Sequence, residues 1–182
     1  MSPFFENSNQ NKVFFIISSS AGIVAKGNEN FNKGGLFLDL LKKKNTNLAI
    51  FWTFFQTLRK FQNTQLEYKI NNTETLNLHT SYLAVSKTPF ISGMFHFDEN
   101  IQRNDGKFLV KILHDYSKIG LINCLHHLST GNEHKLDKIL SRTAEEIQVS
   151  SPIPFVLEYD GEIIITRKAQ FRLYREKINE CT

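Results

Sequence analysis

Asp160 and Gly161 form the strongest local folding signal in this 182-residue chain. The pair stands between two apolar segments of high β propensity, Ile153–Leu157 and Ile163–Ile165. Glycine readily takes a positive φ and aspartate tolerates one, as a two-residue hairpin turn requires. The pattern therefore predicts an antiparallel hairpin. Glu162 follows the turn directly, and a carboxylate on a rigid strand end suits proton transfer or metal binding.

A hydrophobic period of two residues extends the strand pattern beyond this hairpin. It predicts further strands over residues 66–70, 76–78, 82–85, 108–113, 145–149 and 170–174. Helical spacing predicts helices over residues 30–44, from Thr46 or Asn47 to about 61, and over 119–128. Sixteen phenylalanines favour well-packed sheets. We therefore predict a β-dominated α+β fold, a two-layer antiparallel β-sandwich with attached helices.

The domain organisation follows from the start of the chain. Residues 1–12 are polar and rich in asparagine, so we expect them to form a flexible N-terminal segment. Val13–Ile17 then predicts a buried first strand, followed by a turn over Ser18–Gly22. Residues 13–182 have a suitable length for a single domain with one core.

Charge and cysteine content restrict the partners and the compartment. A net charge of +4 is too small to indicate nucleic-acid binding, but it favours approach to a phosphorylated ligand or an anionic membrane. Two cysteines make neither a disulfide framework nor a metal pattern, which favours a cytoplasmic location. No apolar run approaches the ~20 residues of a membrane-spanning helix, so membrane contact would be peripheral, through exposed aromatic and lysine side chains. The aromatic segment Phe51–Phe55 leaves two alternatives, burial on more than one side or a lipid-facing surface.

A second acidic turn, Asn104-Asp105-Gly106, leads into a predicted strand. A carboxylate with nearby carbonyl oxygens suits a hard cation such as Mg²⁺. Taken alone, this turn and the Asp160 turn are equally compatible with ordinary hairpin chemistry. A zinc site at Cys124, His126 and His127 is disfavoured, because these positions diverge around a helix. The sequence contains neither a Walker A motif nor a Gly-x-Ser-x-Gly motif.

The order of these motifs resembles the C-terminal domain of the diacylglycerol kinase and sphingosine kinase-like lipid kinases, especially the soluble bacterial type. The resemblance covers nearly the whole chain and is clearest from Ser92 to Tyr174. The matching motifs are Gly93-Met94, Asp105-Gly106 and Asp160-Gly161-Glu162. Glu99 and Ile101 occupy the positions where the family has proline and alanine.

The resemblance implies transfer of the γ-phosphoryl group of ATP to a lipid with a free hydroxyl. It makes Glu162 the general base, with Asp160 and Gly161 shaping its turn. It also implies a structural Mg²⁺ held by Asp105 and by the main-chain oxygens of Gln102 and Lys107, at a turn that Gly106 supports. Phosphoryl transfer depends mainly on positioning and electrostatic stabilisation, which agrees with so small a set of residues.

One departure qualifies the expected activity. The family binds its nucleotide with a Gly-Gly-Asp-Gly-Thr loop in an N-terminal domain, and this sequence contains no such loop. We therefore expect the nucleotide-binding domain to be absent and the chain to be inactive without it. A separate nucleotide-binding chain or a homodimer are the partners to expect. The alternatives are a non-catalytic lipid- or partner-binding β-sandwich module, and an unrelated sandwich whose acidic turns are coincidental.

Overall fold

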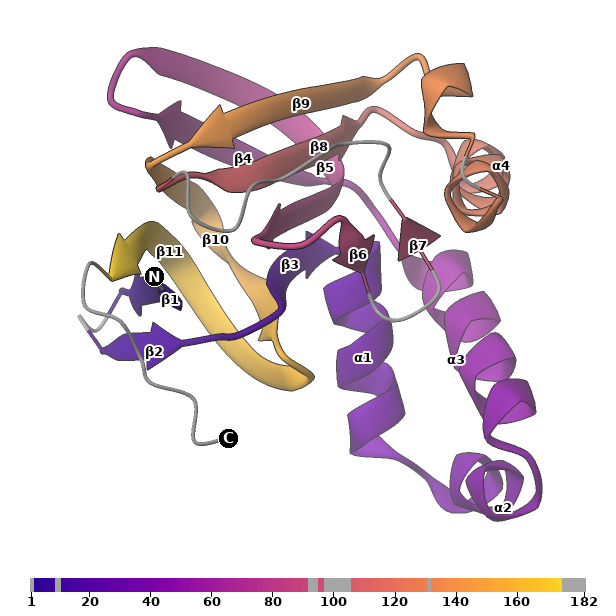
Figure 1. Ribbon diagram of the computed structural model, residues 1–182. Helices are drawn as coiled ribbons and strands as arrows, with labels where there is room; N and C mark the ends of the chain where they lie inside the picture. The colour runs from indigo at the N-terminus through magenta and orange to yellow at the C-terminus, as the bar shows by residue number, and fades with distance from the viewer. Residues whose placement is uncertain (1, 9–10, 92–94, 97–105, 131, 175–182) are drawn as a thin grey trace, which may run out of the picture.

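In the computed structural model, the described residues are 2–8, 11–91, 95–96, 106–130 and 132–174. They form one large antiparallel sheet of nine strands, a separate two-stranded sheet, and helices on one side of the large sheet (Figure 1). The strands are β1 (Ser2–Asn7), β2 (Lys12–Phe14), β3 (Ser18–Gly22), β4 (Thr64–Ile70), β5 (Glu74–Ser86), β6 (Phe90–Ile91), β7 (Phe95–His96), β8 (Phe108–His114), β9 (Ile139–Ala144), β10 (Glu146–Tyr159) and β11 (Glu162–Tyr174). The helices are α1 (Ile23–Lys33), α2 (Leu36–Lys44), α3 (Thr46–Lys60), α4 (Lys118–Ser129) and the 3₁₀ turn η1 (Glu133–Lys135).

Two long strands, β5 and β10, bend the sheet into two layers. The strand order is β2-β1-β11-β10-β3-β5-β8-β9, and β4 also pairs with both β10 and β5. One half of β10 (Ile147–Ser150) pairs with β4, and the other half (Leu157–Tyr159) pairs with β3. The register of β10 against β11 shifts between Ser150 and Phe155, a stretch that contains Pro152 and Pro154. Proline cannot donate a ladder hydrogen bond, so the bend falls at this point. The predicted β-dominated α+β fold is confirmed.

The core lies on both faces of this sheet. Between the two layers, side chains from nine strands or their flanks are fully or almost fully buried, among them Phe5, Leu83, Val110, Leu157 and Phe171. The opposite face of β5 and β8 packs against the helices through a second cluster that includes Tyr82, Leu109 and Cys124. Residues alternate between the two clusters along β5, as the strand period requires.

The helices differ in detail from the sequence prediction. The helix predicted over residues 30–44 is two helices, α1 and α2, separated by Gly34 and Gly35, both of which have positive φ. The predicted cap of the next helix, Thr46 or Asn47, is wrong. Asn45 caps α3 instead, and its side-chain oxygen accepts hydrogen bonds from the N–H groups of residues 47 and 48. No helix of the described residues is long and apolar enough to cross a bilayer.

The N-terminal part of the chain requires a correction. The flexible segment expected over residues 1–12 contains β1, which pairs with β11 along six residues. The buried strand expected over Val13–Ile17 is also wrong, because β2 ends at Phe14, and Ile16 and Ile17 are exposed. Ser18–Gly22, expected as a turn, is strand β3 in the middle of the sheet. These polar and small residues enter the sheet because their partners come from distant segments, which local composition does not reveal.

Candidate active site

The predicted hairpin at Asp160-Gly161 is confirmed. Tyr159 and Glu162 are directly opposite each other at the ends of β10 and β11, leaving a two-residue turn. Asp160 has a φ of 45° and Gly161 a φ of 93°, the positive values that such a turn needs. Helix α1 runs beside the turn, where the Asn32 side-chain amide donates to the Gly161 carbonyl at 3.2 Å. The turn is thus fixed by the sheet on one side and by a helix on the other.

The Asp160 carboxylate connects this turn to the start of β3. Its Oδ2 accepts a hydrogen bond from the Ile16 N–H at 2.5 Å, and its Oδ1 accepts from Ile17 at 2.9 Å and from Ser18 at 3.2 Å. The Asp160 N–H donates in return to the Ser18 carbonyl at 3.1 Å. A carboxylate that accepts several backbone hydrogen bonds has a structural role. Asp160 therefore stabilises the turn, which is the role that the sequence analysis expected of it.

Glu158 is the buried carboxyl group of this region. Its Oε2 accepts from the Ser20 hydroxyl and its Oε1 from the Gly161 N–H, both at 2.7 Å. Burial raises the pKa of Glu158 above its ordinary value, and the neighbouring Asp160 charge adds to the increase. The Tyr82 hydroxyl is buried too, with no hydrogen-bond partner among the described residues, and burial followed by the Glu158 charge raises the pKa of Tyr82 strongly.

The raised pKa of Glu158 predicts a specific dependence of stability on pH. Because the folded protein favours the protonated carboxyl, this group's contribution is fully present below the ordinary pKa of about 4.5 and is lost as the pH rises through the higher folded-state pKa. Glu158→Gln removes the titration. We therefore expect the stability advantage of the wild type over Glu158→Gln, measured by urea unfolding, to decrease steadily from pH 4 to pH 7. Glu145→Gln, at an exposed carboxyl before β10, is the matched control. Parallel pH profiles for wild type and Glu158→Gln would contradict the prediction.

Glu162 is exposed, and it differs from its two acidic neighbours because its side chain makes no hydrogen bond or ion pair among the described residues. It begins β11, and its backbone position is fixed by pairing with Tyr159. The turn thus holds two carboxyl groups in structural hydrogen bonds and presents the third to solvent. This is the arrangement that a proton acceptor on a rigid support requires.

The structure describes only part of the second acidic turn, Asn104-Asp105-Gly106. Asp105 and Gln102, two of the expected magnesium ligands, lie outside the described residues. Gly106 has a φ of 73°, consistent with a turn, and the carbonyl oxygen of Lys107 accepts a hydrogen bond from the buried Lys87 ammonium group. The magnesium site therefore stays a prediction, because only one of its three expected ligands lies among the described residues. Among the described residues, no three His, Cys, Asp or Glu side chains are grouped as metal ligands would be.

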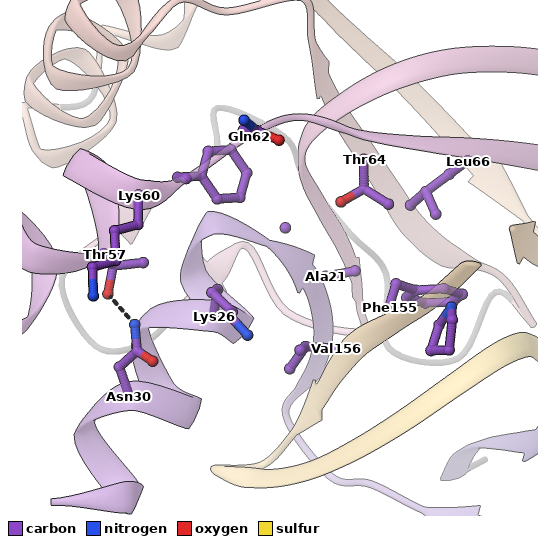
Figure 2. Close-up of a pocket in the computed structure, with 13 residues that line it drawn as sticks. Ala21, Lys26, Asn30, Thr57, Lys60, Gln62, Thr64, Leu66, Phe155 and Val156 are labelled. Carbon is purple, nitrogen blue, oxygen red and sulfur yellow. Dashed lines mark hydrogen bonds between the residues drawn. The ribbon is translucent and has the colours of Figure 1, made fainter.

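A cavity of about 250 Å³ lies between α1, α3 and the sheet (Figure 2). Its floor is apolar, formed by Ala21, Leu66 and Phe155, and the lysines Lys26 and Lys60 line it from the two helices. Lys26 also bonds the carboxylate of the buried Glu29 at 2.5 Å. Burial opposes ionisation of Glu29, but hydrogen bonds from Lys26 and Lys33 lower its pKa overall.

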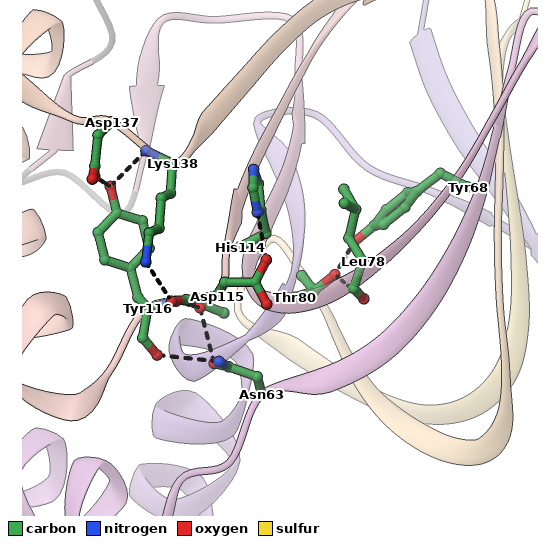
Figure 3. Close-up of polar contacts among 10 residues, drawn as sticks. Asn63, Tyr68, Leu78, Thr80, His114, Asp115, Tyr116, Asp137 and Lys138 are labelled. Carbon is green, nitrogen blue, oxygen red and sulfur yellow. Dashed lines mark hydrogen bonds and ion pairs between the residues drawn. The ribbon is translucent and has the colours of Figure 1, made fainter.

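A third group of titratable side chains lies at the end of β8 (Figure 3). His114 Nδ1 and Asp115 Oδ2 are 2.8 Å apart, and the His114 hydrogen bond lowers the pKa of Asp115. Asp115 has a positive φ of 55°, and its carbonyl accepts from the Lys138 ammonium at 3.1 Å. The Asn63 amide donates to the Tyr116 carbonyl at 3.1 Å, which joins the start of β4 to this turn. The main-chain carbonyls of Asp115 and Tyr116 thus fasten three chain segments together, whereas the His114–Asp115 side-chain pair joins adjacent residues.

Sequence reasoning identified Glu162 and Asp160 but gave no role to Glu158, Ser20 or Tyr82. A carboxylate directly after the apolar segment Ile153–Leu157 was the available signal for Glu158. Its burial, however, depends on the pairing of β10 with β3, which puts Glu158 opposite Ser20. That pairing joins segments far apart in the chain, so the local pattern does not contain it.

Comparisons with known proteins bear on the fold. No protein-family model and no curated protein matches the sequence. Among solved structures, a candidate diacylglycerol kinase from Bacillus anthracis str. Sterne matches with a TM-score of 0.60 and 13% identity over 94% of this chain and 52% of that one. A second match, a structure described as a diacylglycerol kinase from the same strain, has a TM-score of 0.52 and 9% identity over 94% and 49% of the two chains. A third, another candidate diacylglycerol kinase of that strain, has a TM-score of 0.59 and 13% identity over 94% and 53%. The chain spans about half the length of these proteins, and over 94% of its own length it shares their fold.

Proposed function

We propose that this chain is the lipid-substrate and catalytic-base half of an ATP-dependent lipid kinase of the diacylglycerol kinase type. One observation carries the proposal beyond the likeness of fold. Of the three carboxyl groups at the Asp160 turn, Asp160 and Glu158 are bound to backbone and hydroxyl donors, and Glu162 alone is exposed without a hydrogen bond or ion pair among the described residues. The sequence resemblance assigns the base to this same residue.

In the proposed reaction, the hydroxyl oxygen of the lipid attacks the γ-phosphorus of ATP, and Glu162 accepts the hydroxyl proton as the new P–O bond forms. The bond from the γ-phosphorus to the bridging oxygen breaks, and ADP leaves with that oxygen. The rigid hairpin holds the carboxylate in place, so little ordering entropy is lost at the reaction step. The nucleotide would be held by a Gly-Gly-Asp-Gly-Thr domain, in the same polypeptide or in another chain. The magnesium ion expected at Asp105, Gln102 and Lys107 stays a prediction, and no step above depends on it.

The proposal is tested by supplying the nucleotide half separately. This chain is mixed with the nucleotide-binding domain of a diacylglycerol kinase, ATP and diacylglycerol in detergent micelles, and phosphorylated lipid is measured. We expect activity that neither half has alone, and a loss of at least about 100-fold with Glu162→Gln, the lower range for removal of a general base. Glu145→Gln, an exposed carboxyl at a different turn, should leave the activity unchanged. Full activity of Glu162→Gln would remove Glu162 from the base role.

The second candidate function is a non-catalytic module that binds a lipid or a partner kinase chain. The exposed apolar surface of α2 and α3 favours it. The two candidates predict different results in the mixing experiment. Lipid binding without phosphorylation, with both halves and ATP present, would favour the binding module and contradict the kinase proposal.

A further inference from the structure

Helix α3 exposes its apolar side to solvent. Leu48, Phe51, Trp52 and Phe55 follow the spacing i, i+3, i+4 and i+7, so they form one stripe along the helix. Their exposed fractions are 53%, 69%, 40% and 54%. An amphipathic helix on a globular protein normally turns such a stripe toward the core. Here the stripe faces away from it, so α3 has an apolar side that is exposed to solvent.

The buried side of α3 explains this orientation. Ala49, Thr53 and Thr57 lie inside, and the two threonine hydroxyls donate to the carbonyls of residues 49 and 53 at 2.8 Å. The Thr57 hydroxyl also accepts a hydrogen bond from the Asn30 amide of α1 at 2.9 Å. Small side chains with internally satisfied hydroxyls let α1 and α3 approach closely. Leu58 is buried on this side as well, so the large apolar residues of the exposed stripe are not needed for the packing of the helix.

Helix α2 extends the same surface. Leu36, Phe37 and Leu40 are exposed by 92%, 57% and 66%, whereas Leu38 points into the protein. The rings of Phe37 and Trp52 meet edge to face, with centroids 5.2 Å apart, which joins the two helices into one surface. Figure 1 shows α2 at the end of α1 and α3 that is remote from the sheet. We name this surface the α2–α3 apolar face; it consists of Leu36, Phe37, Leu40, Leu48, Phe51, Trp52 and Phe55.

The charge around the α2–α3 apolar face identifies its partner. Residues 33–60 hold six basic side chains and one acidic side chain, a net charge of +5, whereas the whole chain carries only +4. Lys43 and Lys44 are exposed at the end of α2. Two copies of this chain meeting through these faces would bring two +5 segments together, which disfavours a homodimer here. Exposed aromatic and leucine side chains bordered by lysines are instead typical of helices that lie in the surface of an anionic bilayer.

We propose that the α2–α3 apolar face docks on anionic phospholipid membranes. The apolar side chains enter the boundary between headgroups and acyl chains, and the lysines contact the lipid phosphates. The docked face adjoins the candidate base, because Asn32 of α1 bonds Gly161 of the turn and α2 begins four residues later. This last step, which brings the membrane near Glu162, rests on the proposed function; the docking itself does not.

Trp52 is the only tryptophan of the chain and lies in this face, so it reports docking directly. The full chain is mixed with vesicles of phosphatidylcholine and phosphatidylglycerol, or of phosphatidylcholine alone. We expect a blue shift of Trp52 emission and co-sedimentation with the anionic vesicles, both weakened by high salt. Phe51→Ser combined with Phe55→Ser should weaken binding by about tenfold or more, and Lys43→Glu combined with Lys44→Glu by a similar factor.

The matched control is Ile119→Ser combined with Ile122→Ser, which removes two exposed apolar side chains from α4 and should leave vesicle binding unchanged. Circular dichroism and thermal unfolding confirm that each variant is folded. Absence of a blue shift, equal binding to neutral vesicles, or wild-type binding by the Phe51/Phe55 variant would overturn the proposal. A concentration-dependent dimer abolished by the same variant, without vesicle binding, would assign the face to a second copy. Vesicle binding needs neither ATP nor the nucleotide half, so failure of kinase activity leaves this result intact.

Discussion

Replacing Phe5 by alanine should lower the free energy of unfolding by about 3–5 kcal/mol, the range for truncating a buried aromatic side chain. Phe5 is fully buried, and its ring centroid lies 5.5 Å from that of Phe171 and 5.4 Å from that of Tyr159. It therefore fastens β1 to β11 and to the end of β10. Urea unfolding followed by circular dichroism measures the change.

Phe14→Ala provides the comparison within the same N-terminal region. Phe14 lies on β2 and is 47% exposed, so its loss should cost less than about 1 kcal/mol. A flexible N-terminal segment would make both substitutions harmless. Equal, small effects of Phe5→Ala and Phe14→Ala would therefore contradict the pairing of β1 with β11.

Replacing Asp160 by alanine should lower the free energy of unfolding by about 2–4 kcal/mol, because two effects add. Three backbone N–H groups, from Ile16, Ile17 and Ser18, lose their carboxylate acceptor. Alanine is also strained at the positive φ of this position, which aspartate and asparagine tolerate. Urea unfolding measures the loss, and amide chemical shifts of residues 16–18 show whether their hydrogen bonds are gone.

Asp160→Asn separates the two effects. Asparagine keeps the tolerance of positive φ and one side-chain acceptor, but it loses the charge, so we expect roughly half of the destabilisation. If Asp160→Ala were as stable as the wild type, with unchanged amide shifts at residues 16–18, the carboxylate would not hold this connection. In that case Asp160 would be available for chemistry, and the assignment of Glu162 as the only carboxylate of the turn without a hydrogen bond among the described residues would have to be revised.

Local signals predicted the elements whose determinants are close in sequence. The Asp160-Gly161 hairpin, helix α3 and helix α4 were all predicted, because turn chemistry and hydrophobic spacing decide them within a few residues. The long strands β5 and β10 were predicted only as separate short strands. Each of these strands is continuous because it pairs with strands of both layers. The register shifts near Thr80 in β5 and after Ser150 in β10 do not interrupt them. Single-strand patterns do not carry that information.

The features of the candidate site also fall into two groups, those that the sequence predicted and those that required the structure. The position of Glu162 follows from its turn, so the sequence was sufficient to locate it. The structural commitment of Asp160 and the burial of Glu158 depend on β3, which the sequence pattern presented as a turn. The exposure of Phe51 and Phe55 also required the structure, because their spacing predicts an apolar stripe without showing which way it faces.

The pairing of β1 with β11 has a consequence for biosynthesis. Phe5 and Phe171 are opposite each other in the sheet, yet they stand near the two ends of the described chain. During translation, β1 leaves the ribosome long before its partner strand is made. Contacts of such sequence separation close late and slow the folding of a β-rich domain. We therefore expect the nascent chain to expose Phe4 and Phe5 until β11 emerges, and chaperones that recognise apolar segments to act mainly in that interval.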